Sequence, residues 1–166
     1  MVHRVYVEKK PSEALEAKAL ANEIRSFLGI TSLKNLRIVN RYDVENISEA
    51  VEMAAATRVF SEPQSDFCIF NTVDVPEGST VIVWEYLPGQ YDQRADSAEQ
   101  CLSLLRAGLA SSCTVGTEPP RVRCAKMVVL SGTVTVDDVK KIENYLINPV
   151  DSVSYTHLTL PTICSV

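Results

Sequence analysis

Residues 86–101 read YLPGQYDQRADSAEQC, and no other stretch of this chain is as informative. An apolar strand pattern runs into the turn signal Leu87-Pro88-Gly89, and a dense polar block then leads into an apolar helix pattern. Polar residues packed so closely between two elements are costly to bury, so we expect a surface that fits another molecule or domain. We interpret this block as a domain interface made of Gln90, Asp92, Gln93, Arg94, Asp96 and Ser97.

The second half of the chain, which surrounds this block, is predicted to read strand, helix, strand, helix. Ser97 and Gln100 form a capping box for the first helix, and Gly108 is expected to end it. Thr135 and Asp138 are expected to cap the last helix. The predicted elements are strand 80–86, helix 97–107, strand 122–130 and helix 136–147.

The first half shows the same order of elements and ends in one more strand. Ser12 can cap its first helix, and Ile24 lies on the apolar stripe of that helix. Gly29 suits the position after the helix, where a left-handed backbone is favoured. The predicted elements are strand 2–7, helix 12–28, strand 36–42, helix 49–58 and strand 67–70.

The repeated order of elements suggests a duplication. Pro63 aligns with Pro149, and at a slightly different offset Val5 aligns with Val83. We therefore expect an α+β fold with helices over one sheet face, built as a tandem duplication of a strand-helix-strand-helix unit with pseudo-two-fold symmetry. The expected repeats are about residues 1–72 and 79–152.

The net charge, the apolar runs and the first residues of the chain argue against several classes of function. The formal net charge is −5 and no basic cluster occurs, so nucleic-acid binding has little support, and we interpret Lys9-Lys10 as a solvated strand end. No apolar run approaches the roughly 20 residues that span a membrane. The first residues lack the apolar core of a signal peptide, so we expect a cytoplasmic protein.

The five cysteines show no C-x-x-C pair and no zinc spacing, so we expect reduced, mostly structural thiols. Cys101 follows a predicted helix start and could act as a nucleophile if His3 served as its base. The other histidine, His157, lies in a suspect tail. An unrelated small-molecule enzyme that uses Cys101 is therefore one alternative.

The tail changes composition abruptly. Residues 153–162 read VSYTHLTLPT, rich in Thr and Leu, and carry over no helix or strand period. This string reads as a translated sequencing adapter of the transposase type, so we expect residues 153–166 not to be native and the natural reading frame to run on past Ser152.

Five motifs, in order and spread over nearly all of residues 1–152, resemble the N-terminal region of the large, single-chain phosphoribosylformylglycinamidine synthases. They are VEKKP (7–11), NRYDVE (40–45), VFSEP (59–63), YLPGQYDQRADSAEQC (86–101) and YLINPV (145–150). The resemblance implies a domain made of two fused copies of the small subunit that other bacteria make separately. It also implies that this chain is the front of a longer enzyme.

That enzyme is the ATP-dependent glutamine amidotransferase of purine synthesis, which converts formylglycinamide ribonucleotide to formylglycinamidine ribonucleotide. The resemblance implies that ATP, Mg²⁺ and the glutaminase residues belong downstream. This chain has no G-x-x-x-x-G-K loop and no acidic cluster suited to magnesium, so we expect no catalytic, cofactor-binding or metal-binding residue in it. Its expected partners are the synthetase and glutaminase domains of the same polypeptide, which it would dock so that ammonia passes between them.

Several alternatives stay open. The chain could be a free-standing assembly subunit that bridges a separate synthetase and glutaminase. The polar block could instead cap its helix locally, or contact substrate or the ammonia path. Arg41 and Asp43, at the end of a predicted strand, are either interface residues or a strand-end ion pair.

Overall fold

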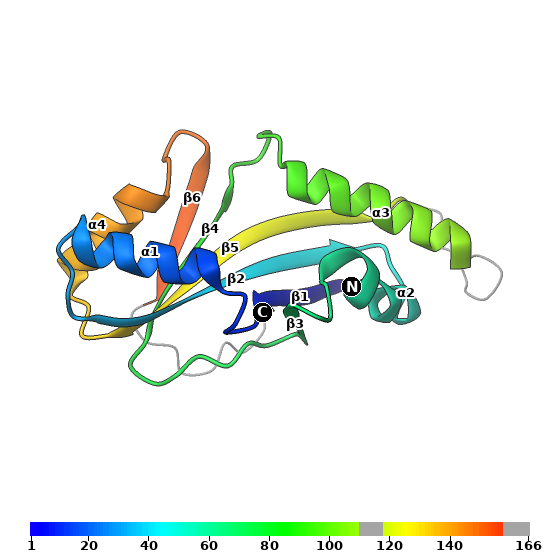
Figure 1. Cartoon of the computed structure of the whole chain (residues 1–166). Helices are drawn as coiled ribbons and strands as arrows, with labels where there is room; N and C mark the ends of the chain where they lie inside the picture. The colour runs from blue at the N-terminus through cyan, green and yellow to red at the C-terminus, as the bar shows by residue number, and fades with distance from the viewer. Residues whose placement is uncertain (110–117, 158–166) are drawn as a thin grey trace. The chain divides into compact units, whose positions relative to one another are not determined.

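The chain folds as an α+β protein (Figure 1), and the computed structural model describes residues 1–109 and 118–157. The strands are β1 (Val2–Lys9), β2 (Leu33–Glu45), β3 (Asp66–Phe70), β4 (Thr80–Tyr86), β5 (Arg121–Gly132) and β6 (Ser152–His157). The helices are α1 (Leu15–Ser26), α2 (Glu49–Ala55), α3 (Gln93–Leu109) and α4 (Val136–Leu146), and a π-helical turn, η1 (Ala56–Phe60), continues α2. The strands form an antiparallel sheet in the order β3-β1-β2-β5-β4-β6.

The chain divides into two compact units, each assembled from three separate stretches. The first unit comprises residues 1–10, 40–73 and 91–124. The second comprises residues 11–39, 74–90 and 125–166. Each unit therefore takes helices from both halves of the sequence: α2 and α3 belong to the first, and α1 and α4 to the second.

The core of the first unit lies between α2, α3 and one face of its strands. Alternate residues of β1, Val5 and Val7, point into this core together with Val44 of β2. Leu102 of α3 is fully buried among them, and Tyr42 packs on Phe60 with ring centroids 4.9 Å apart.

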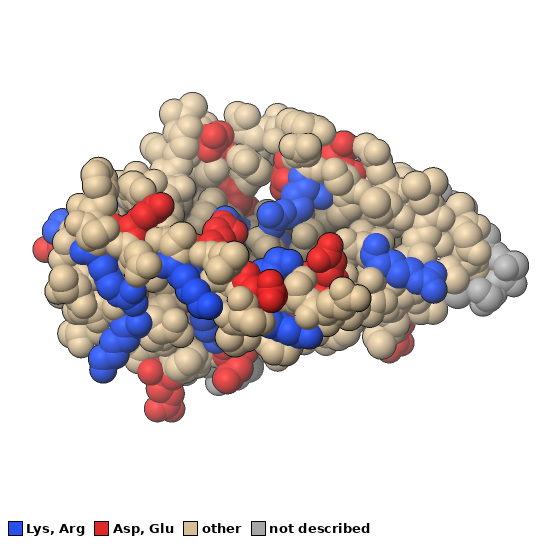
Figure 2. All heavy atoms as spheres, viewed as in Figure 1, with Lys and Arg blue, Asp and Glu red and all other residues tan. Residues whose placement is uncertain are grey.

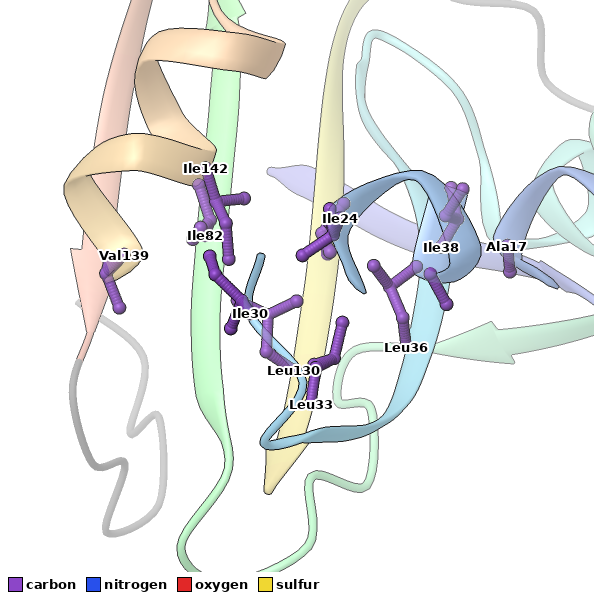
Figure 3. Packing of buried hydrophobic residues seen from close by; sticks show 12 residues of the cluster. Ala17, Ile24, Ile30, Leu33, Leu36, Ile38, Ile82, Leu130, Val139 and Ile142 are labelled. Carbon is purple, nitrogen blue, oxygen red and sulfur yellow. The ribbon is translucent and has the colours of Figure 1, made fainter. Parts of the chain in front are cut away.

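The core of the second unit, shown in Figure 3, joins α1 and α4 to β4 and β5. Ile24 of α1 and Ile142 of α4 are both fully buried against Ile82 and Leu130. Residues of β4 and β5 that point to the opposite face, such as Val129, are buried as well. Burial on both faces explains why these two strands read as continuous apolar runs rather than alternating ones.

Sequence patterns located the last helix well. Thr135 and Asp138 form the predicted capping box of α4 in both directions, and the helix starts at Val136 as expected. Strand β4 also has its predicted bounds. Gly29, just past α1, has the expected left-handed backbone, with φ of +72°.

Two predicted helix starts were wrong. Helix α1 begins at Leu15 with Ala14 as its N-cap and no side-chain cap, so Ser12 does not cap it. Helix α3 begins at Gln93, four residues before the predicted start, and continues through Gly108 to Leu109. The predicted capping role of Ser97 and the predicted end at Gly108 are therefore both incorrect.

Residues 153–157 of the suspected tail lie in strand β6, and the non-native origin of the tail stays a prediction; its remaining residues, 158–166, lie outside the described part of the chain. Strand β6 pairs antiparallel with β4, from Tyr86 opposite Ser152 to Val81 opposite His157. Regular pairing along the β4 edge needs only backbone groups, which explains how a Thr-rich segment can occupy it. Within the described residues, no helix is both long enough and apolar enough to cross a membrane.

Candidate functional site

Asp92 of the polar block caps the N-terminus of α3. The side-chain Oδ1 of Asp92 accepts hydrogen bonds from the amides of Arg94 and Ala95, at 3.0 and 3.2 Å. A carboxylate at this position satisfies amides that have no partner within the helix and complements the positive end of the helix dipole. Asp92, rather than Ser97, therefore fixes where α3 begins.

Arg94 connects the block to strand β2. Its Nη1 donates to Oδ1 of Asn40, which lies 54 residues away in the sequence. Asn40 opens the NRYDVE segment, so two of the segments singled out in the sequence meet at this contact within the first unit. Arg94 was predicted as a site residue, but Asn40 was missed because nothing local in the sequence marks such a distant partner.

Asp96 accepts two side-chain hydrogen bonds on the outer side of α3. Its Oδ2 accepts from the hydroxyl of Tyr91 at 3.1 Å and from Nε2 of Gln100 at 2.9 Å. The hydrogen bond to Asp96 raises the pKa of the Tyr91 hydroxyl, while the side chain of Tyr91 stays 71% exposed. Gln93 and Ser97 are exposed on α3, and Gln90 is exposed in the second unit.

Arg41 and Asp43, the other two predicted site residues, form a separate cluster. Asp43 accepts from Nε and Nη2 of Arg4 at 2.6 and 3.2 Å, and Nη2 of Arg41 lies 3.2 Å from its Oδ2. The hydrogen bond to Asp43 raises the pKa of the Arg4 guanidinium. Side chains alternate between the two faces of a strand, so Arg41 and Asp43 face away from Asn40 and Tyr42. The predicted residues therefore do not form one site.

A half-buried thiol, Cys124, and a buried phenol, Tyr42, lie on the Asn40 side of β2. Burial raises the pKa of Tyr42, and Arg94 opposes this effect. Burial also raises the pKa of Cys124 to about 12, and the nearby carboxylate of Asp92 adds to the shift. A raised pKa favours the protonated thiol at neutral pH, which makes Cys124 a poorer nucleophile than an ordinary cysteine.

The candidate base for Cys101 has another partner. Nδ1 of His3 lies 2.7 Å from Oε2 of Glu52, and both side chains are largely buried. His3 on β1 and Glu52 on α2 therefore fasten the helix to the strand. Cys101 is exposed on α3. The structure thus gives His3 a structural contact with Glu52, whereas a pairing with Cys101 was only one alternative raised by the sequence.

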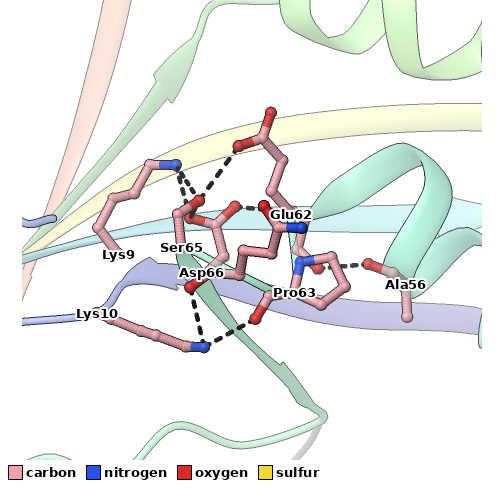
Figure 4. Close-up of polar contacts among 9 residues, drawn as sticks. Lys9, Lys10, Ala56, Glu62, Pro63, Ser65 and Asp66 are labelled. Atoms are coloured by element: carbon pink, nitrogen blue, oxygen red, sulfur yellow. Dashed lines mark hydrogen bonds and ion pairs between the residues drawn. The ribbon is translucent and has the colours of Figure 1, made fainter.

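Two of the resembling segments, VEKKP and VFSEP, meet at the turn that leads into β3, shown in Figure 4. Nζ of Lys9 lies 2.7 Å from Oδ1 of Asp66, and Nζ of Lys10 donates to the carbonyl of Pro63 at 2.8 Å. The amide of Glu62 donates to Oδ2 of Asp66 at 2.8 Å. Lys9 is exposed at the end of β1, as predicted, and Lys10 is half-buried; both lysines also hold this turn against β1.

A second turn, containing Pro149 of YLINPV, leads into β6 in the same way. The amides of Asp151 and Ser152 donate to the carbonyl of Asn148, at 3.3 and 3.0 Å. The amide of Leu87 then donates to the carbonyl of Asp151 at 2.8 Å, which fastens the turn to the end of β4. This segment therefore determines where the next strand starts.

Within residues 1–109 and 118–157, no three His, Cys, Asp or Glu side chains are grouped so that they could hold a metal ion. Acidic and basic side chains are interspersed on the face shown in Figure 2. No protein-family model matches this chain. No curated protein matches it either. The function of this chain is therefore inferred from the hydrogen bonds described above.

Proposed function

We propose that this chain is the N-terminal, small-subunit-like part of a phosphoribosylformylglycinamidine synthase, built by tandem duplication, and that it works as a docking domain. In the whole enzyme it would hold the synthetase and glutaminase domains in register, so that ammonia released from glutamine reaches the ATP-dependent step. The chemistry would take place in polypeptide beyond this chain.

The observation that carries the proposal is the correspondence of the two turns. In the first turn, the amides of Ser65 and Asp66 donate to the carbonyl of Glu62, at 3.0 and 2.8 Å. In the second, Asp151 and Ser152 donate to Asn148, and each residue lies 86 positions after its counterpart (148 − 62, 151 − 65, 152 − 66).

Each turn is also fastened to a neighbouring strand in the same way. The amide of Lys10 donates to the carbonyl of Ser65 at 2.8 Å, as the amide of Leu87 does to Asp151. Such agreement in distant parts of a chain is typical of an internal repeat. In the strand pairing, Val5 of β1 occupies the position that Ile82 occupies in β4, one residue before the Val83 with which the sequence alignment matched it. Val5 and Ile82 each point into the core of their own unit.

Strand order supports the same proposal. Each strand of the first half has a counterpart in the second half: β1 and β4, β2 and β5, β3 and β6. If the counterparts are exchanged, the order β3-β1-β2-β5-β4-β6 reads the same from the opposite edge of the sheet. The third strand of each half pairs antiparallel with the first. A duplicated unit with pseudo-two-fold symmetry would have this property.

The site geometry favours docking over chemistry. Asp92 caps a helix, Arg94 bonds to Asn40, and Asp43 bonds to two arginines, so these charges fix local structure. Charged side chains that already have hydrogen-bond partners within the domain suit a surface that keeps one shape when a neighbouring domain packs on it.

The test uses the parent enzyme, which the gene extended past Ser152 should encode. Arg94→Ala is expected to lower glutamine-dependent synthesis, while synthesis from added ammonia is retained, because the change would disturb domain register and not the synthetase site. Lys18→Ala, which removes an exposed positive charge from α1, outside the polar block, serves as the matched control. An equal loss of both activities, or a gene with neither domain downstream nor as a neighbouring partner, would contradict the proposal.

A further inference from the structure

An exposed pair of aromatic rings lies where α1 and α4 end in the second unit. Phe27 is the C-cap residue of α1, and Tyr145 lies in the last turn of α4. Their ring centroids are 6.0 Å apart, and the ring planes are tilted by 43°. Phe27 is 76% exposed and Tyr145 is 43% exposed. Rings at this spacing attract each other, so the pair is formed without a partner.

A carboxylate lies beside the two rings. Oε2 of Glu23, one turn before Phe27 on α1, accepts a hydrogen bond from the hydroxyl of Tyr145 at 3.1 Å. This hydrogen bond raises the pKa of Tyr145. Among residues 1–109 and 118–157, the side chain of Glu23 has no other hydrogen-bond or ion-pair partner. Its second oxygen, Oε1, is therefore available to a donor from outside. We call Glu23, Phe27 and Tyr145 the aromatic site.

Three properties of the aromatic site favour a positive charge. The carboxylate of Glu23 attracts a cation, and so do the faces of aromatic rings. The C-terminal ends of helices carry a partial negative charge, and α1 and α4 both end here. Helix α4 has no basic residue in its last turn. Arg25, in the last turn of α1, donates instead to the carbonyls of Leu33 and Lys34, at 2.8 and 2.7 Å.

Another exposed ring of this protein already has a cation above it. Nζ of Lys10 lies 5.7 Å from the centroid of the Phe67 ring, which is 48% exposed. Within the described part of the chain, no Lys or Arg lies in this way over Phe27 or Tyr145. The aromatic site therefore has the groups that attract a cation but no cation from its own unit.

We propose that the aromatic site binds an arginine side chain of a neighbouring domain. A guanidinium group is planar, so it can lie flat on the Phe27 ring while an N–H at its edge donates to Oε1 of Glu23. The ammonium of a lysine is more strongly hydrated and cannot stack in this way. One weak contact is sufficient, because a domain of the same polypeptide presents its arginine at a high effective concentration. The source of the arginine rests on the docking role proposed above, whereas the binding chemistry does not.

The experiment titrates the purified, isotope-labelled chain with the capped peptide acetyl-glycyl-arginyl-glycinamide at constant ionic strength, and follows backbone amides by NMR. Amides at the ends of α1 and α4 should shift with a dissociation constant on the order of 0.1 M, because one ring contact and one exposed ion pair hold the peptide. The lysine counterpart should bind at least about threefold more weakly. The citrulline counterpart, which has the same shape without the charge, should not shift these amides.

Two substitutions separate the ring from the charge. Phe27→Leu keeps an apolar side chain but removes the ring face, and Glu23→Gln keeps the shape but removes the charge. Each should weaken binding of the arginine peptide at least about threefold. Phe67→Leu is the matched control, because it changes an exposed ring that already holds Lys10, and it should leave binding unchanged. Circular dichroism checks that all three variants fold.

The proposal is wrong if the arginine peptide does not shift these amides, or if the lysine or citrulline peptide shifts them equally. It is also wrong if neither Phe27→Leu nor Glu23→Gln weakens binding. These measurements use this chain alone, whereas the docking role is tested by the two synthetic activities of the parent enzyme. A failure of one is therefore distinguishable from a failure of the other.

Discussion

Arg4 donates two hydrogen bonds to Asp43, from Nε at 2.6 Å and from Nη2 at 3.2 Å, and so joins β1 to β2 through a planar, two-point ion pair. Arg41 approaches the same carboxylate at 3.2 Å. Asp43 therefore holds both arginines, and it is the less exposed partner of the Arg4 pair.

Asp43→Asn should lower the free energy of unfolding by about 1–3 kcal/mol, because it removes charge-assisted bonds and leaves two arginines facing each other. Urea denaturation measures the change. Glu77→Gln, at an exposed loop position, is the control and should alter stability by less than about 0.5 kcal/mol. Equal effects of the two changes would show that the ion pair does not stabilise the fold.

Gly132→Ala is expected to be strongly destabilising. Gly132 has φ of +134°, and an added Cβ would lie 2.3 Å from the carbonyl oxygen of Ser32. Backbone atoms there cannot move aside without disturbing the start of β2. Gly108→Ala is the contrast: Gly108 lies within α3 with open space around it, so alanine should stabilise by up to about 1 kcal/mol. Thermal unfolding of both variants checks the opposite signs.

Asp66 should make stability depend on acid pH. Burial alone would raise the pKa of this carboxyl, but the amide of Glu62 and the ammonium of Lys9 outweigh burial and lower it. A pKa below the unfolded value of about 3.9 means that the folded state gains stability above that pH and loses it as pH falls further. Asp66→Asn should therefore be less stable than the wild type at pH 7, and the difference should shrink below about pH 4.

Urea denaturation at a series of pH values measures this difference. Asp74→Asn, in an exposed loop, is the control and should show no comparable change with pH. A difference between Asp66→Asn and wild type that stays constant from neutral to acid pH would exclude the role assigned to Asp66.

The cysteines should differ in reactivity. Cys124, with a pKa raised to about 12 by burial, should react slowly with iodoacetamide at neutral pH, whereas the exposed Cys101 should react quickly. Mass spectrometry of digested, time-sampled protein measures both rates. Cys101→Ala should leave thermal stability unchanged within the limits of a surface substitution. Faster labelling of Cys124 than of Cys101 would contradict the burial described for β5.

Local signals explain which parts of the fold could be predicted from sequence. The capping box at Thr135 identified α4 because both partners lie within one turn of each other. The start of α3 was wrong because Asp92 and Ser97 are both good N-cap residues, and only the folded chain decides between them. Helix α1 was wrong because its N-cap, Ala14, carries no capping signal at all.

Contacts between distant residues could not be predicted. The Arg94–Asn40 and His3–Glu52 pairs join residues 54 and 49 positions apart, and no periodicity in the sequence marks such partners. The polar block stays a predicted interface. The sequence added Arg41 and Asp43 to the same set of candidate residues. Alternation along β2 places them on the other face, and that separation follows from the strand's bounds, which the sequence underestimated.

The exchange of helices between the two halves has a consequence for synthesis on the ribosome. The first unit contains the N-terminal strand, yet its core needs Leu102, so the first seventy residues to emerge cannot bury their apolar side chains alone. Neither unit can finish folding until the segments that are synthesised last have emerged. Until then, the nascent chain exposes the apolar side chains of its strands. A cell that makes this protein should therefore depend on chaperone capture of the unfinished chain until α3 and β5 have left the exit tunnel.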